Sequence, residues 1–96
     1  MTIQSLVATK SHFPLGDIVI TTNARSILTT AEVTSALHRH ARGDWGDLPP
    51  QDAESNVKAL EKGSRLFSAY GEGKRRFWII TEADRSATTI LMPLDY

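Results

Sequence analysis

The sequence has no cysteine, no long apolar run and no excess of charge of either sign. Without cysteine there are no disulfides and no thiolate metal sites. The apolar runs are far too short to cross a membrane, and residues 1–10 lack the basic segment and apolar core of a signal peptide. Because eleven Lys and Arg residues balance eleven Asp and Glu residues, no overall field attracts nucleic acid or an anionic membrane. We therefore expect a cytoplasmic protein without a membrane segment.

The composition that is present, 41% apolar and 23% charged residues, is typical of a globular protein. The 96 residues are enough for one domain, residues 1–96, with a modest core. Residues 1–13 show no clear hydrophobic period, so we expect either a flexible arm or an extra edge strand there. Residues 17–22 form a β-branched run after a turn, which predicts the first strand.

A first helix is predicted over residues 30–42. Thr29 stands three residues before Glu32, which is the arrangement of a capping box, and Gly43 provides a stop. Between these signals the apolar positions fall on one helical face. That face consists of Val33, Ala36, Leu37, His40 and Ala41.

A second helix is predicted over about residues 50–62. Pro50 suits the first helical position, and Gly63 ends the pattern. Its inner face consists of Ala53, Asn56, Val57 and Leu60. Because a buried amide needs polar partners, we expect Asn56 to fasten the loop at residues 43–47 to the helix.

Three strands are predicted after the helices. Residues 64–70 alternate, a turn follows at 71–73, and two β-rich runs at 74–82 and 87–92 flank a short polar connector, which is the pattern of a hairpin. The sequence thus predicts an α+β fold, with two helices packed on one face of a mostly antiparallel sheet of about four strands, in the order β-α-α-β-β-β. The last two strands are apolar on both sides, so the second face of the sheet must be covered by the N-terminal segment, a second copy or a partner.

The order of short motifs resembles a family of small uncharacterised bacterial proteins found on plasmids, integrated elements and chromosomes. Members sometimes carry labels such as plasmid-related protein or type I restriction subunit. The resemblance rests on Gly43–Gly46, Asn56 with Ala59-Leu60 and Gly63, Arg65–Tyr70, Trp78–Ser86 and Thr88–Leu91, and it covers residues 43–92 closely. It supports the boundaries of the predicted elements and implies no activity, cofactor or partner.

Acidic residues supply one candidate site. The loop that holds Asp44, Trp45 and Asp47 places two carboxylates beside an indole, and Glu82 and Asp84 lie in the hairpin connector. Together these carboxylates could hold a divalent cation and support a small metal-dependent hydrolase. The structural alternative is that Trp45 fills the end of the core.

The hairpin connector also predicts a clasp. Asp84 is expected to accept N–H groups of the turn, and Arg85 is expected to pair with a carboxylate such as Glu82 or Asp44. Polar side chains of these types satisfy the backbone of a reversing chain.

Basic residues supply a third candidate. Lys74, Arg75 and Arg76 cluster beside Phe77 and Trp78 in the strand predicted at 74–82, and basic residues next to aromatic ones can follow a single-stranded nucleic acid. Arg65 is a fourth candidate contact for nucleic acid. The structural alternative is that a charged strand start discourages edge pairing.

No signature of a phosphate loop, a serine nucleophile or a zinc site is present, and His38 and His40 are spaced wrongly for a helical metal pair. His40 lies on the apolar face, which is more typical of a histidine at the core edge that hydrogen-bonds a nearby carbonyl or carboxylate than of a catalytic base. The sequence therefore favours a non-enzymatic accessory or protein-interaction module, with no cofactor, that forms a homodimer or binds a partner through its second sheet face. The alternatives are a nucleic-acid-associated protein and the metal-dependent hydrolase.

Overall fold

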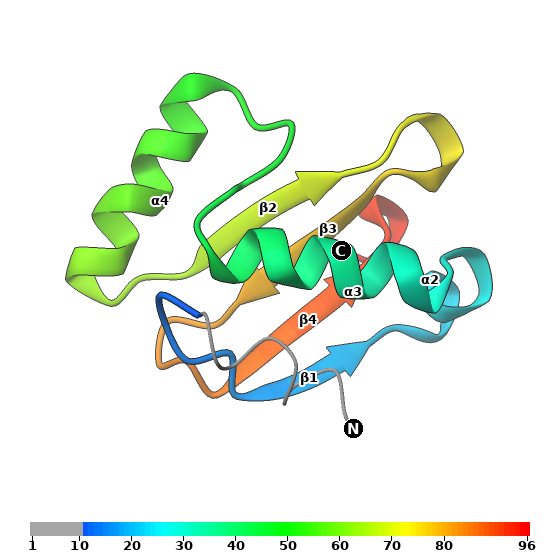
Figure 1. The fold of residues 1–96 in the computed structure, drawn as a ribbon, viewed down its shortest axis with the longest axis horizontal. Coiled ribbons are helices and arrows are strands. Elements are labelled where there is room, and N and C mark those ends of the chain that lie inside the picture. Colours follow the sequence, from blue (N-terminus) through cyan, green and yellow to red (C-terminus); the bar gives the residue numbers. More distant parts are fainter. Residues whose placement is uncertain (1–10) are drawn as a thin grey trace.

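The computed structural model describes residues 11–96 of the chain and shows one four-stranded sheet with helices around it (Figure 1). The strands are β1 (Asp17–Ile20), β2 (Leu66–Tyr70), β3 (Phe77–Thr81) and β4 (Ala87–Leu91), in the spatial order β1-β4-β3-β2. β2, β3 and β4 are antiparallel neighbours, whereas β1 pairs with β4 in parallel. The predicted α+β class and element order are confirmed.

Three helices lie within residues 11–96: α2 (Thr22–Ile27), α3 (Thr30–Ala41) and α4 (Pro50–Lys62). The predicted capping box is present, because Thr29 Oγ1 accepts from the N–H of Glu32 while Glu32 Oε1 accepts from the N–H of Thr29. Gly63 ends α4 in the left-handed conformation, at φ 71°. α2 is a short helix of six residues that the sequence analysis did not predict.

The helices and the sheet share one hydrophobic core. α3 crosses one face of the sheet, and α4 lies beside β2 (Figure 1). Leu37 of α3 and Ala59 of α4 belong to the same buried cluster, with Leu60 packed against it. The strands contribute Leu66, Tyr70, Phe77, Ile79 and Ile90 to that cluster.

The outer edge of β2 is covered by two separate sets of hydrogen bonds, one from a side chain of α4 and one from the backbone of a loop. Asn56 of α4 forms two hydrogen bonds with the backbone of Phe67, one from Nδ2 to the carbonyl (2.6 Å) and one from the N–H to Oδ1 (3.0 Å). Farther along, the N–H of Ala69 donates to Trp45 O (3.1 Å) and the N–H of Asp47 donates to Ala69 O (2.8 Å). No outward peptide group of β2 is therefore left for another strand.

The close approach of this loop depends on Gly46, which lies between the two backbone bonds to Ala69. Gly46 has φ +74°, and a Cβ atom there would lie 1.9 Å from Ala69 O. Any other residue would push the loop away from β2. The predicted bond between Asn56 and the loop is wrong, because the loop binds the strand through its own backbone and leaves the amide of Asn56 to Phe67.

Several boundaries and burials differ from expectation. Val57 was placed on the inner face of α4 but is 53% exposed, because α4 packs beside β2 with Asn56 and Ala59 turned inward instead. Lys74 and Arg75 lie in a 3-10 turn, η1 (Gly73–Arg75), so the basic residues precede β3 and are not part of it. Residues 1–10, on which the prediction of an arm or edge strand chiefly depends, lie outside the described part of the chain.

A last 3-10 turn, η2 (Pro93–Asp95), follows β4. Asp95 holds it in place, because Oδ2 accepts from the hydroxyl of Thr21 at 2.7 Å and from the N–H of Met92 at 2.9 Å. Among residues 11–96, no helix is long and apolar enough to cross a membrane.

Candidate functional site

The sheet has one face packed on α3 and one face turned away from it. Ser68 and Thr81 point toward α3, because both side chains are hydrogen-bonded to His40 of that helix. Since neighbouring side chains of a strand alternate between faces, Phe67 and Ile80 point to the opposite side. We call this opposite side the aromatic face.

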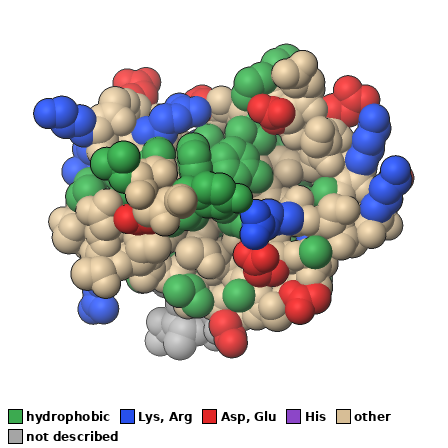
Figure 2. Space-filling view, turned by 180° about the vertical axis from the view of Figure 1, so that it is seen from behind, with side chains coloured by type: hydrophobic (Ala, Val, Ile, Leu, Met, Phe, Trp, Pro, Cys, Tyr) green, Lys and Arg blue, Asp and Glu red, His purple; other side chains and the backbone are tan. Residues whose placement is uncertain are grey.

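The strand register arranges the aromatic face in three rows across the sheet. The first row is charged and contains Arg65, Glu82, Ala87 and Asp17. The middle row contains Phe67, Ile80, Thr89 and Val19. The third row contains Ala69, Trp78 and Leu91. Figure 2 views the molecule from this side and shows apolar side chains gathered in the middle, with charged ones of both signs around them.

Three aromatic rings form a continuous line on this face. The ring of Phe67 lies 5.1 Å from that of Trp78, and Trp78 lies 5.9 Å from Tyr96, both pairs edge to face. Phe67 and Trp78 are half-buried, whereas Tyr96 is 72% exposed. Val19 in β1 is 47% exposed on the same face. Ile80 and Leu91 of the same face are already buried, at 5% and 6% exposure, and Tyr96 lies against Trp78, so the exposed apolar surface is chiefly that of Val19, Phe67, Trp78 and Tyr96.

Arg65 fixes the outer part of the aromatic line. Its Nη1 donates to Tyr96 Oη at 2.9 Å, and its Nη2 lies 3.4 Å from Glu82 Oε1. The hydrogen bond that Arg65 donates to Tyr96 and the nearby charge of Glu82 raise the pKa of Arg65. The guanidinium therefore stays charged at the border of an apolar surface.

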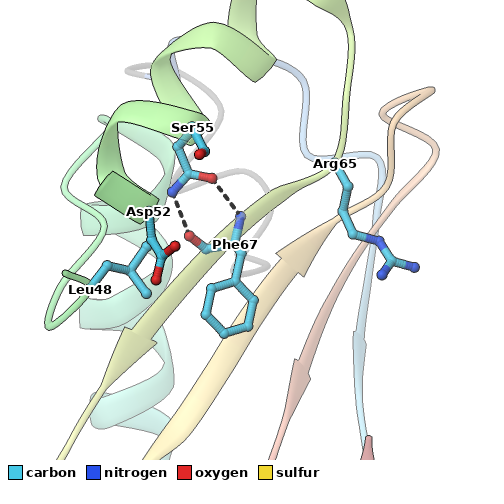
Figure 3. Close-up of a pocket in the computed structure, with 6 residues that line it drawn as sticks. Leu48, Asp52, Ser55, Arg65 and Phe67 are labelled. Atoms are coloured by element: carbon cyan, nitrogen blue, oxygen red, sulfur yellow. Dashed lines mark hydrogen bonds between the residues drawn. The ribbon is translucent and has the colours of Figure 1, made fainter. Parts of the chain in front are cut away.

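A shallow cavity of about 320 Å³ opens where α4 meets the aromatic face (Figure 3). Leu48, Asp52 and Ser55 line it from the helix side, and Arg65 and Phe67 line it from the strand side. The walls thus combine an aliphatic side chain, an aromatic ring and one charge of each sign. Such mixed walls suit a side chain of another protein.

The acidic candidates do not come together. Asp44 pairs with Arg39 through two contacts, 2.7 and 3.2 Å, and this arginine lowers the pKa of the Asp44 carboxyl. Asp47 lies 3.8 Å from Arg76, and Glu82 faces Arg65. In residues 11–96, no group of three or more His, Asp or Glu side chains is placed to hold a metal ion.

The hairpin connector has the expected acceptor in Asp84, whose Oδ1 accepts from the N–H of Ser86 at 3.0 Å. The expected carboxylate partner of Arg85 is wrong. Its guanidinium instead donates to backbone carbonyls, which join the connector to the end of α4. These acceptors are Ser64 O (2.6 Å), Glu82 O (3.0 Å), Ala59 O (3.2 Å) and Ala83 O (3.3 Å).

The basic candidates are largely engaged within the chain. Arg75 forms an ion pair with Glu32, and its hydrogen bond lowers the pKa of that carboxyl to about 2. Arg76 faces Asp47, and Arg65 faces Glu82. Three of the four candidate nucleic-acid contacts therefore already have an acidic neighbour, and Lys74 alone of the four forms no ion pair with a described residue.

A buried chain of hydrogen bonds lies between α3 and the sheet, and the sequence analysis did not predict it. Thr88 Oγ1 donates to Leu15 O (2.7 Å), and it lies 2.8 Å from Thr81 Oγ1, which lies 2.8 Å from His40 Nε2. Because a carbonyl only accepts, we assign the protons so that Thr81 donates to Thr88 and His40 Nε2 donates to Thr81. His40 Nδ1 then accepts from Ser68 Oγ at 2.5 Å.

Burial keeps His40 neutral. The side chain is fully buried between the rings of Phe13 and Trp45, and burial, together with the smaller effect of the positive charge of Arg85, lowers its pKa to about 3. The predicted carbonyl or carboxylate partner is wrong, because both ring nitrogens bind hydroxyls. The signal in the sequence was the hydroxyls of Ser68, Thr81 and Thr88 on otherwise apolar strands.

Trp45 fills the end of the core, as the structural alternative predicted. Its side chain is 7% exposed, and its ring stacks on that of Phe13 with 6.2 Å between the ring centres. Tyr96 was not recognised as part of any site, because its place beside Trp78 depends on the direction of the turn after β4, which no sequence pattern indicates.

A comparison of the chain with protein families, with curated proteins and with solved structures gives no match. The resemblance of residues 43–92 to the mobile-element proteins stays a prediction.

Proposed function

We propose that this protein is a non-enzymatic interaction module that binds another protein chain through its aromatic face. The observation that supports this proposal is the line of Phe67, Trp78 and Tyr96 on the sheet face opposite α3, where the first two rings are half-buried and Tyr96 is 72% exposed. Tryptophan, tyrosine and arginine are the residues most often responsible for binding energy at protein interfaces, and Arg65 borders the line.

The surroundings of the line match the general anatomy of an interface. Its centre is apolar, and its border carries Arg65 and Glu82 with about half of each side chain exposed. A protein interface ordinarily has an apolar centre and a polar rim of this kind. The cavity beside Phe67 adds a recess in which one side chain of a partner can be desolvated.

Catalysis is less well supported by the buried polar residues. The pairing of His40 with Ser68 resembles a base beside a nucleophile, but both side chains are 0% exposed. A substrate would reach Ser68 only after the core opened. The network is better explained as a way to satisfy polar side chains inside the core.

Binding through this face is tested by capture with two matched variants. Thr89→Lys places a charge in the middle row of the aromatic face, and Ser35→Lys places the same charge on the exposed side of α3. Tagged wild-type protein is mixed with an extract of its host, and the captured chains, including untagged copies of this chain, are quantified. We expect the same chain to be captured by the wild type and Ser35→Lys and lost with Thr89→Lys. Equal capture by all three would contradict the proposal.

A further inference from the structure

We propose that the chain bound by the aromatic face is a second copy of this protein, packed face to face about a two-fold axis that runs parallel to the strands between β3 and β4. This inference rests on the proposed function and names its partner. A two-fold dimer uses the same patch on both copies, so the patch must be complementary to itself. Whether the aromatic face is complementary to itself depends on how its three rows meet those of the second copy.

Only two principal orientations of the axis bring this face against its own copy with the strands aligned. An axis across the strands would place the charged row against the row of Trp78, which would bury charge on apolar side chains. An axis along the strands places each row against itself in the reverse direction. The second orientation keeps polar residues with polar residues and apolar residues with apolar residues.

In this orientation the charged row becomes complementary. Read across the sheet, the row carries a positive, a negative, a neutral and a negative residue, namely Arg65, Glu82, Ala87 and Asp17. Reversal places Arg65 opposite Asp17 of the second copy, twice by symmetry, and places Glu82 opposite Ala87. No two like charges face each other directly, so charge selects this arrangement.

The same reversal covers apolar side chains that stay partly exposed in one copy. Half-buried Phe67 comes to lie opposite Val19 of the second copy, which is 47% exposed. In the third row half-buried Trp78 lies opposite Leu91, which its own chain already buries. Two sheets that pack face to face stand about 10 Å apart, a distance that side chains of this size fill.

The dimensions of the molecule leave room for such a contact. Its extents are 34 × 32 × 18 Å, so it is a slab with a broad face and one helical layer. A stable interface uses about 800 Å² of accessible surface on each partner, which a face of that breadth provides. The net charge of zero adds no long-range repulsion between two copies.

Sedimentation equilibrium of the full chain, from about 1 µM to about 1 mM, tests this dimer. We expect a concentration-dependent dimer. Thr89→Lys should weaken it by at least about tenfold, whereas Ser35→Lys should leave its dissociation constant unchanged. Circular dichroism and denaturant unfolding of each variant show whether the monomer is still folded.

Charge reversal tests the orientation of the axis. Asp17→Arg and Arg65→Asp, each alone, should weaken the dimer by about tenfold, because each creates two like-charge contacts across the axis. The double variant Asp17→Arg with Arg65→Asp should recover most of the lost affinity. Failure of this recovery, with all variants folded, would overturn the proposed orientation.

A chain that stays monomeric up to the highest concentration, or a dimer that Thr89→Lys leaves intact, would overturn the second copy as the partner. The capture experiment separates this failure from that of the proposed function. A monomeric wild type that still captures a different chain, and loses it with Thr89→Lys, keeps the interaction module and removes only the homodimer. A monomer whose capture is insensitive to Thr89→Lys removes both.

Discussion

The side-chain amide of Asn56 occupies the position of a neighbouring strand for Phe67, with bonds of 2.6 and 3.0 Å to its carbonyl and N–H. The pair joins α4 to the edge of the sheet and places the ring of Phe67 on the aromatic face. Because Asn56 is only 4% exposed, water cannot readily replace either bond. The same contact therefore closes one sheet edge and positions the proposed interface.

We expect Asn56→Ala to lower the free energy of unfolding by about 1–3 kcal/mol, since it leaves the N–H and carbonyl of Phe67 without partners. Urea unfolding followed by circular dichroism measures this loss. Ser55→Ala is the matched control, because the Ser55 hydroxyl bonds only Gln51 O within the same helix and is exposed. A loss as small as that of the control would show that the amide does not hold the edge.

The hairpin connector offers a way to separate backbone strain from side-chain bonding. Arg85 has φ 61°, which disfavours every residue with a Cβ atom, yet its guanidinium joins backbone carbonyls around the connector. Arg85→Ala should lower the free energy of unfolding by about 1.5–3 kcal/mol, because those charged hydrogen bonds are lost. Arg85→Gly should be less damaging by about 1 kcal/mol, since glycine accepts the positive φ. If the two variants were equally stable, the strain at this position would be negligible.

Burial of neutral His40 predicts a loss of stability in mild acid. Its pKa is about 3 in the folded protein and near 6.5 in an unfolded chain, so the unfolded state binds more protons between these values. The free energy of unfolding should therefore fall as the pH drops below 6.5, by up to about 1.4 kcal/mol per pH unit. The groups around the ring are the rings of Phe13 and Trp45, the hydroxyls of Ser68 and Thr81, and the charge of Arg85.

The window from pH 6.5 to 5 isolates this effect, because the carboxyls with a lowered pKa stay ionised there. These carboxyls belong to Glu32, Asp44, Asp84 and Asp95. His40→Gln keeps one donor and one acceptor but does not titrate. Urea unfolding at several pH values should give a steep slope for the wild type and a nearly flat one for the variant. Equal slopes would place the titration elsewhere.

The ion pairs of the basic residues predict weak binding of nucleic acid. Arg75 and Arg76 are neutralised by Glu32 and Asp47, so few cations remain to displace counterions from phosphates. Fluorescence anisotropy with labelled single-stranded DNA should show no more than weak binding that salt abolishes. Replacing Lys74, Arg75 and Arg76 together by alanine should remove it. Tight, sequence-selective binding at physiological salt would favour the nucleic-acid alternative.

Local signals in the sequence were sufficient for the two long helices of this fold. The capping box at Thr29 and the proline at the start of α4 predicted both long helices within about one residue, because caps act through contacts of near neighbours. The parallel pairing of β1 with β4 is a contact between residues far apart in the chain, and no short pattern indicates it. The exposure of Val57 depends on where α4 sits, which is likewise set by distant residues.

In the candidate site, too, local features could be predicted from the sequence, whereas contacts between distant residues could not. The two-sided apolar character of the last strands predicted a second apolar sheet face that the N-terminal segment, a second copy or a partner must cover, because side-chain alternation is a local property. The three rows, the place of Tyr96 on Trp78 and the carbonyl partners of Arg85 depend on register and turn geometry. These features became visible only in the folded chain.

The most direct test of the aromatic face as the interface is the exposure of Trp78 to water during association. In a Trp45→Phe variant, whose fold is checked by circular dichroism, Trp78 is the single tryptophan, and acrylamide quenching of its fluorescence reports its contact with water. We expect quenching to decrease as the chain associates with its partner, in parallel with the dimer fraction measured by sedimentation. Association that leaves the quenching of Trp78 unchanged would show that the aromatic face is not the interface.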